Sequence, residues 1–269
     1  MSSETKFEFT RQNIDSFLKE LAKEYRKQVG KAIPAELILI GGASVLVNYG
    51  FRDMTTDIDA LIHASSAMKD AIRSVGDRFS LPNNWLNADF TQTDSYSPKL
   101  AEFSVYYKTW SNILTVRTVS AEYLVAMKLR SGRQYKSDLS DVIGILAEHE
   151  KNGTPLRIEQ IQKAVSDLYG SWNHLPETSQ AFIQNIFRDG HFERLYSQIV
   201  KDENDTRALL VRFDQDYPKM LKSENADSVA ESLQKKTDRA SLLASLRERQ
   251  QSETGQRLHS DKRLSRDAR

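Results

Sequence analysis

The chain contains no cysteine, and this absence excludes several kinds of chemistry at once. Without a thiol there can be no disulfide bond, no zinc–thiolate site and no cysteine nucleophile. No window approaches about 18 uninterrupted apolar residues, so the sequence predicts no membrane-spanning helix. The opening residues, MSSETKFEF, lack the basic and apolar regions of a secretion signal. We therefore expect a cytoplasmic protein without membrane partners.

An excess of charge of either sign is also absent, because the formal net charge is +1. This balance gives little information about partners, so local groups of charges must be considered instead. The length of 269 residues, with 39% hydrophobic and 28% charged residues, is ordinary for a globular protein with a polar tail. It is sufficient for one large core and a second, smaller unit.

The central stretch of the sequence is ELILIGGASVLVNYGFRDMTTDIDALI, from Glu36 to Ile62. Its apolar run at 37–40 lies between Pro34 and two glycines, which predicts a buried strand. The segment 43–49 has helical character. Backbone N–H groups at 42–44 would then lie at a helix N-terminus, where free donors and the helix dipole favour an anion. The pattern therefore predicts a phosphate-binding turn.

Two acidic residues, Asp57 and Asp59, occur in the next predicted strand. Strand side chains repeat every second residue, so both carboxylates should point to one face, roughly 6 to 7 Å apart. Mg²⁺ prefers oxygen ligands and is usually completed by water and substrate phosphates. This pair therefore predicts a magnesium site that faces the phosphate-binding turn.

Each of these motifs also has a simpler explanation. A Gly-Gly-Ala-Ser turn can be just a tight strand-to-helix connection, and an Asp-x-Asp pair can be solvated surface. Their joint order favours the functional interpretation, because unpaired carboxylates in an otherwise apolar strand cost several kcal/mol to bury.

The order strand, Gly-Gly-x-Ser, helix and T-x-D-x-D resembles the nucleotidyltransferase superfamily of the DNA polymerase β type. The fuller pattern of GGAS, YGFR and TTDID is most similar to AbiEii-type toxin nucleotidyltransferases of type IV toxin–antitoxin systems. The resemblance covers about the first half of the chain. It implies Mg²⁺ at Asp57 and Asp59. It also implies nucleotide binding by the following residues: Gly41, Gly42, Ser44, Arg52 and Thr55.

The polymerase β-type pattern further implies a third carboxylate that activates the attacking hydroxyl. Two strands are predicted at 101–110 and 112–119, and the second contains Arg117 but no acid. Glu102 on the first strand is the preferred candidate, and Asp89 is the alternative. Without such an acid, metal and nucleotide binding would still be plausible, but the case for catalysis would be weaker.

A helix is predicted from the N-cap Ser120 to Gly132, with Lys128 in the middle of its apolar residues. Such a lysine often extends only to reach water. The resembling toxin stretch, L-x-A-M-K-L-x-x-x-R, implies instead that Lys128 contacts the triphosphate, with support from Arg133 and Arg130.

The next predicted helix begins at Ser137 and carries Asp138 and Asp141 in its first turn. Acids at this position complement the helix dipole. The resemblance implies in addition that Asp138 orients Lys128 or Arg133, and the two interpretations are compatible.

The remaining sequence predicts helices. A first amphipathic helix runs from the N-cap Thr10 to Gly30, and its basic face is either solvated or in contact with nucleic acid. Another helix is predicted to start at Thr154 and Pro155, and separate helices follow around 192–199 and 209–213. We predict a nucleotidyltransferase domain at 1–150, a helical domain at 151–221 and a polar, partly disordered tail at 222–269.

The sequence thus predicts an α/β protein with a polymerase β-like core, a mixed sheet and an all-helical C-terminal unit. The expected activity is Mg²⁺-dependent transfer of a nucleoside monophosphate from an NTP to an RNA end, tRNA included, or to a protein hydroxyl. The resemblance implies a toxin-type or phage-defence setting and a cognate antitoxin as partner. The alternatives are a non-catalytic nucleotide- or RNA-binding module and a partner-binding module on the same fold.

Overall fold

The structure is a computed structural model that describes residues 7–133, 137–222 and 225–235. These residues form two compact units: the first extends to Val200 and the second begins at Lys201. The predicted division at residues 150 and 221 stays a prediction. The predicted disorder after Gln250 lies outside the described residues.

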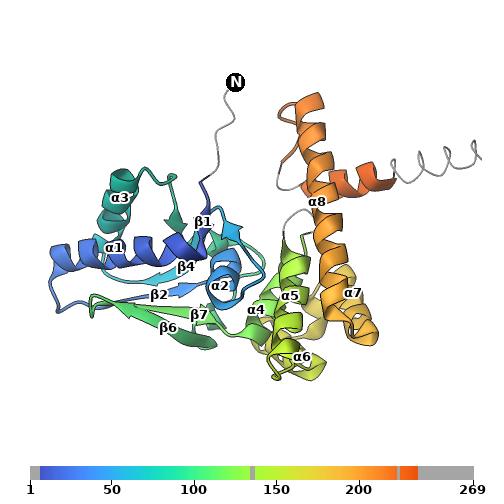
Figure 1. The fold of residues 1–269 in the computed structure, drawn as a ribbon, viewed down its shortest axis with the longest axis horizontal. Helices are drawn as coiled ribbons and strands as arrows, with labels where there is room; N and C mark the ends of the chain where they lie inside the picture. The colour runs from blue at the N-terminus through green and yellow to red at the C-terminus, as the bar shows by residue number, and fades with distance from the viewer. Residues whose placement is uncertain (1–6, 134–136, 223–224, 236–269) are drawn as a thin grey trace, which may run out of the picture. The chain divides into compact units, whose positions relative to one another are not determined.

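A mixed sheet forms the centre of the first unit (Figure 1). Its strands, in spatial order, are β5 (Leu86–Asn87), β4 (Ile58–His63), β2 (Ala35–Leu39), β7 (Leu114–Val119) and β6 (Ser104–Trp110). Strand β2 is antiparallel to β4 and parallel to β7, and β6 is antiparallel to β7. Two short strands, β1 (Phe9–Thr10) and β3 (Met54–Thr55), pair with each other. The predicted α/β fold with a mixed sheet is confirmed.

The helices of the first unit are α1 (Arg11–Val29), α2 (Gly41–Asn48), α3 (Ala67–Phe79), α4 (Ala121–Ser131), α5 (Asp138–Lys151), α6 (Ile158–Tyr169) and α7 (Glu177–Asp189). Three short 3-10 helices are η1 (Asp89–Gln92), η2 (Pro98–Ala101) and η3 (Trp172–His174). Helix α8 (Phe192–Asp216) begins in the first unit and continues into the second.

Alternation along β2 separates two hydrophobic clusters, one on each face of the sheet. Leu37 and Leu39 belong to the cluster that contains the apolar faces of α1 and α3, which cover one face together (Figure 1). Ile38 and Ile40 belong to the cluster that contains α4 and α5. These three β2 side chains and Ile40, which follows the strand, are all buried, as expected for a central strand covered on both faces.

Helices α6 and α7 share the second cluster with the sheet. Ile161, Val165 and Ile183 are fully buried there, together with Leu124 of α4 and Ile143 of α5. Burial of each such side chain contributes about 1.5–3 kcal/mol of hydrophobic stabilisation. The helices beyond residue 150 therefore contribute to the same core that supports β2.

Two predicted helix boundaries are wrong. Helix α6 begins at Ile158 with Arg157 as its N-cap, rather than at Thr154 and Pro155. The carbonyl and hydroxyl oxygens of Thr154 instead lie 3.2 and 3.3 Å from Nδ1 of His149, at the end of α5. The two helices predicted around 192–199 and 209–213 are the single helix α8.

The described part of the second unit contains the rest of α8 and a helical stretch at 226–235. Glu203 and Thr206 are buried on α8, and Gln234 Nε2 donates to Thr206 Oγ1 over 2.6 Å. In the described ranges of both units, no helix is long and apolar enough to cross a bilayer.

Candidate functional site

The turn between β2 and α2 brings the predicted glycines to a helix N-terminus. Ile40 is extended, and Gly41 adopts φ +55°, a left-handed conformation that L side chains rarely adopt. A Cβ on Gly41 would lie 3.8 Å from Asp59 Oδ2. The carboxylate of Asp59 is therefore next to the first turn of α2.

Gly42 permits an even closer approach. A Cβ at this position would lie 2.8 Å from Thr55 Oγ1 and 2.9 Å from Arg52 Nη2, closer than real Cβ atoms come to other atoms. The guanidinium of Arg52 thus packs against the backbone of α2. The structure brings Gly41, Gly42, Arg52, Thr55 and Asp59 together, and their binding of nucleotide and metal stays a prediction.

Ser44, one turn into α2, is fully buried. Its Oγ is the buried side-chain polar atom that has no hydrogen-bond partner among the described residues. Buried hydroxyls are nearly always hydrogen-bonded, so such an exception calls for an explanation. A hydroxyl close to a helix N-terminus could donate to a ligand oxygen.

The two acids of the Asp-x-Asp motif differ in position. Strand β4 begins at Ile58, so Asp59 lies within the strand and is half-buried, whereas Asp57 precedes the strand and is exposed. This corrects the prediction that both acids lie in one strand, because the strand includes Asp59 but not Asp57. Ile40 N donates to Asp59 O over 2.9 Å, which fixes Asp59 beside the β2–α2 turn.

In the described residues, no three His, Cys, Asp or Glu side chains are arranged to hold a metal ion. Two carboxylates alone still suit Mg²⁺, because this ion is commonly held by one or two carboxylates and completed by water and substrate phosphates. The donor set at Asp57 and Asp59, next to a helix N-terminus, therefore fits a magnesium ion that shares its coordination with phosphate.

The strand register shows which side chains share the face of Asp59. Leu39 pairs with Ala60 on one side and with Thr118 on the other, so Ile40 and Val119 follow in line with Asp59. Thr115, Arg117 and Val119 are the β7 side chains on this face. Arg117 donates to the side-chain and backbone oxygens of Ser104. Strand β7 thus supplies no third carboxylate.

Glu102 does not lie on a strand, which corrects its predicted position. It is exposed in the turn between η2 and β6, two residues before Ser104. Ser104 pairs with Val119, three strand spacings from Asp59 across the sheet. At about 4.8 Å per spacing, the separation is roughly 14 Å, too far for Glu102 and Asp59 to share one ion. Asp89, the other candidate, is exposed in η1.

A buried ion network lies behind the turn, within the first unit. Lys128 Nζ is 2.7 Å from Asp138 Oδ1 and 2.8 Å from Asp141 Oδ2. Arg52 Nη1 lies 2.5 Å from Asp141 Oδ2, and Arg133 Nε lies 2.8 Å from Asp138 Oδ2. The order of contacts is therefore Arg52, Asp141, Lys128, Asp138 and Arg133. Helices α4 and α5 supply the middle of this network.

Burial and neighbouring charges act in opposite directions on the pKa values of Lys128 and Asp138. Burial alone would lower the pKa of Lys128, but the facing carboxylates of Asp138 and Asp141 raise it above its ordinary value. Burial alone would raise the pKa of Asp138, but Lys128 and Arg133 hold that pKa well below its usual range. Both groups are therefore charged at neutral pH.

These contacts bear on the two interpretations of Lys128. Its side chain is 7% exposed and its ammonium is bound by two carboxylates, so it does not extend to water. Asp138 contacts both Lys128 and Arg133, as the orienting role would require. Contact between Lys128 and a triphosphate stays a prediction.

For two residues, the position in the structure differs from the predicted role at the site. Arg130 donates to the backbone carbonyls of Asp94 and His174 and lies over the ring of Tyr169, so the structure does not bring it to the turn. Asp141 joins Arg52 to Lys128 and was not among the predicted site residues. Its three-residue spacing from Asp138 in the first turn of α5 is the signal that could have identified it.

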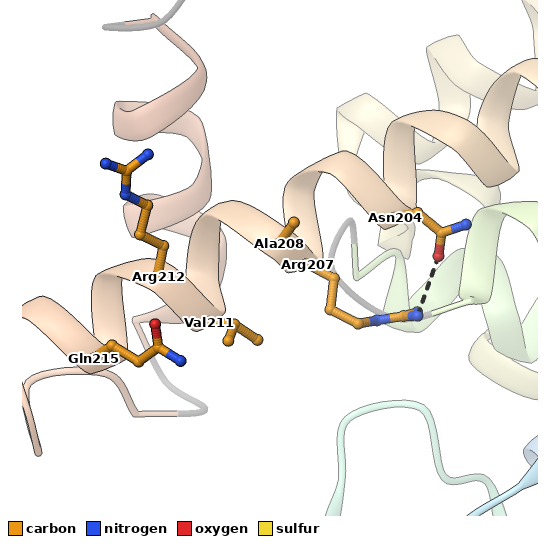
Figure 2. Close-up of a pocket in the computed structure, with 6 residues that line it drawn as sticks. All are labelled: Asn204, Arg207, Ala208, Val211, Arg212 and Gln215. Atoms are coloured by element: carbon orange, nitrogen blue, oxygen red, sulfur yellow. Dashed lines mark hydrogen bonds between the residues drawn. The ribbon is translucent and has the colours of Figure 1, made fainter.

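A groove in the second unit lies along one face of α8 (Figure 2). Arg207 Nη1 donates to Asn204 Oδ1 over 3.2 Å at one end of it. The lining residues are Asn204, Arg207, Ala208, Val211, Arg212 and Gln215. None of them is a predicted site residue, so the candidate site remains at the β2–α2 turn.

Comparison with known proteins supports the class of this site. Residues 16–149 match a family described as "Nucleotidyltransferase of unknown function (DUF6036)". The matched segment includes the β2–α2 turn, the Asp-x-Asp motif and the whole ion network. No curated protein and no solved structure matches the chain. The match supports the nucleotidyltransferase superfamily and, in general terms, a nucleotide-binding transferase.

Proposed function

We propose that the first unit binds an NTP with Mg²⁺ and transfers its nucleoside monophosphate to an RNA end or a protein hydroxyl, releasing pyrophosphate. The observation that carries this proposal is the convergence of Gly41, Gly42, Arg52 and Asp59 at the N-terminus of α2. The family match over the same residues supports it.

The phosphates would bind at the first turn of α2. Its free N–H groups and dipole favour an anion, and Arg52 lies against Gly42 with its guanidinium oriented by Asp141. The hydroxyl of Ser44 lies in the same turn and has no hydrogen-bond partner among the described residues. Because Ser44 is fully buried, its donation to a phosphate oxygen would require the first turn of α2 to open.

Asp57 and Asp59 would hold the magnesium ion on the strand side of the turn. When bound, the ion would neutralise phosphate charge and polarise the phosphorus under attack. Arg52 would stabilise the charge that develops on the leaving pyrophosphate, with Lys128 and Arg133 contributing to the local positive field.

The setting that we propose is a toxin-type or phage-defence protein that acts in the cytoplasm and is paired with a cognate antitoxin. The motifs GGAS, YGFR and TTDID support this finer assignment by their resemblance to AbiEii-type toxins. RNA, tRNA included, and a protein hydroxyl both stay open as acceptors.

A second candidate function is nucleotide or RNA binding without transfer. It is favoured by the register of β7, which presents Arg117 and Val119 rather than an acid on the face of Asp59. Without a general base near the metal, an NTP could bind without being attacked efficiently.

One experiment separates the two functions. The purified protein is incubated with each α-phosphate-labelled NTP, Mg²⁺ and total cellular RNA, beside the Asp57→Ala/Asp59→Ala variant. Transfer predicts label on RNA or protein with the wild type and none with the variant. Mg²⁺-dependent NTP binding with no label in either sample would reject transfer and support the binding module.

A further inference from the structure

Five residues, Tyr49 to Asp53, connect α2 to β3, and we call the first four of them the 49–52 loop. Arg52 ends this loop and reaches the N-terminus of α2, so the position of its guanidinium depends on the path of the loop. Every residue of the loop contacts α5, which lies about 90 residues later in the sequence.

The contacts progress regularly along α5. Tyr49 OH lies 3.3 Å from His149 Nε2, and Gly50 N donates to Glu148 Oε2 over 3.0 Å. The residues contacted on α5 come in reverse order, from His149 through Glu148 and Gly144 to Asp141. The loop therefore runs antiparallel to α5.

Phe51 makes the closest approach in this contact. A Cβ on Gly144 would lie 2.6 Å from the Phe51 ring, so the ring packs directly on the backbone of α5. Arg52 follows, with its guanidinium bound to Asp141 and its Nε donating to the carbonyl of Met54 over 3.1 Å. The backbone at Phe51 thus determines where the Arg52 side chain starts.

A residue outside the family-matched segment holds this backbone. Tyr196, in the first turns of α8, donates its hydroxyl to the carbonyl oxygen of Phe51 over 3.1 Å. The two rings also meet edge to face, with centroids 5.5 Å apart. Tyr196 and Phe51 both belong to the first unit, and the family match ends at residue 149.

We propose that Tyr196 is a positioning residue for nucleotide binding, which acts on the phosphates through the Phe51 carbonyl and the Arg52 guanidinium. This inference rests on the proposed function, because it assigns Arg52 to the phosphates. It assigns to the helical extension a part in the site itself. Helix α8 would hold the 49–52 loop in place through the hydrogen bond of Tyr196 to the Phe51 carbonyl.

The test removes one hydroxyl from the full-length chain. Binding of ATP, CTP, GTP and UTP with Mg²⁺ is measured by titration calorimetry for the wild type and for Tyr196→Phe. One hydrogen bond corresponds to about a three- to tenfold change in an equilibrium constant. We expect Kd to rise by that factor in Tyr196→Phe, because the ring is kept and the hydrogen bond to the Phe51 carbonyl is lost.

The chain offers a matched control. Tyr169 also donates its hydroxyl to a backbone carbonyl, that of Ser95, over 2.7 Å in the same unit. Tyr169→Phe removes the same atom without touching the 49–52 loop. We expect it to leave Kd unchanged. An equal rise of Kd in both variants would show a general loss of stability and overturn the proposal.

A double-mutant cycle tests whether the effect passes through Arg52. In an Arg52→Lys background, which keeps a cation at this position, Tyr196→Phe should change Kd by less than twofold. A full three- to tenfold effect in that background would overturn the route through Arg52.

The outcomes also separate this inference from the proposed function. If the wild type binds NTP and Tyr196→Phe binds it equally well, the inference fails and the proposed function stands. If no NTP binds to the wild type, the proposed function fails, and the inference fails with it.

Discussion

Replacement of Lys128 by methionine tests the buried ion network most directly. The side chain of Lys128 is 7% exposed, and those of Asp138 and Asp141 are 1% and 3% exposed. Removal of one partner from a buried ion pair costs about 3–5 kcal/mol, because a buried charge loses its compensation. Each aspartate keeps its ion pair with one arginine, so we expect the free energy of unfolding to fall by about 3 kcal/mol.

The measurement is thermal unfolding at neutral pH. A loss of about 3 kcal/mol corresponds to a decrease in Tm of about 6–12 °C for a unit of this size. Lys163→Met is the control, because Lys163 is 71% exposed and pairs with Asp167 on the surface of α6. Such exposed pairs contribute at most about 1 kcal/mol. Equal Tm values for the two variants would refute the reasoning.

A compensating variant strengthens the test. Lys128→Met combined with Asp138→Asn removes one charge of each sign and leaves the pair of Arg52 with Asp141 intact. Arg133 loses its ion pair with Asp138, but its side chain is 35% exposed, so water can solvate its charge. The double variant should therefore be more stable than Lys128→Met alone. A further loss of stability would contradict the assignment of the cost to an uncompensated charge.

The network also predicts a pH dependence with a definite sign. The pKa of Asp138 is lowered by folding, so its contribution is complete above the ordinary value of 3.8 and is lost as the pH falls toward the folded pKa. The pKa of Lys128 is raised, so its contribution is complete below 10.5 and is lost at higher pH. The difference in Tm between the wild type and Lys128→Met should be constant from about pH 5 to 9 and should shrink below about pH 4. The unfolding transitions are measured by circular dichroism. A difference in Tm that stays constant down to pH 2 would contradict this explanation.

Two further changes test the site and its support. Gly42→Ala should displace Arg52, weaken NTP binding by about tenfold and lower stability by about 1 kcal/mol. Gly50→Ala is the control, because within 4 Å its Cβ would meet only Glu148, at 3.9 Å. It should leave NTP binding near the wild-type value in the same titration. Truncation after Val200 should leave a folded first unit. Truncation after residue 150 removes buried side chains such as Ile161, so circular dichroism should show an unfolded chain. A cooperative unfolding transition in the shorter chain would refute this.

The parts of the site that are close in sequence could be predicted well. The order of a buried strand, two glycines and a helix is a local pattern, and the structure confirms it at β2 and α2. Asp59 could be placed on the next strand by its alternation with Ile58 and Ala60. Asp57 was misplaced by one position, which is the usual uncertainty of a strand end.

The contacts that complete the site could not be predicted, because they join residues far apart in the chain. Arg52 and Asp141 are separated by 89 positions, and Phe51 and Tyr196 by 145. Periodicity shows which face of a helix is buried but not which loop it meets. The Thr154-Pro155 signal failed for a related reason, since contact with His149 outweighs a local helix-start preference.

Helix α8 was predicted as two helices because its middle, around KDENDTRA at 201–208, lacks an apolar stripe. A polar segment can still be helical when its neighbours on both sides are held by packing. Tyr196 and Ile199, before this segment, pack against the core of the first unit, to which they belong. Leu210, after it, is buried in the second unit. The hydrophobic pattern therefore located the ends of α8 but not its continuity.

The charges around the turn argue for the order in which its ligands bind. Among the described residues, the ion network has three cations and two carboxylates. Asp59 brings a further carboxylate next to the first turn of α2, and Asp57 lies two residues before it. These two carboxylates would repel the phosphates of an NTP that binds without a metal ion. A divalent cation between them and the phosphates would remove this repulsion. NTP binding should consequently depend on Mg²⁺, and the Asp57→Ala/Asp59→Ala variant should bind NTP in a manner that Mg²⁺ affects much less.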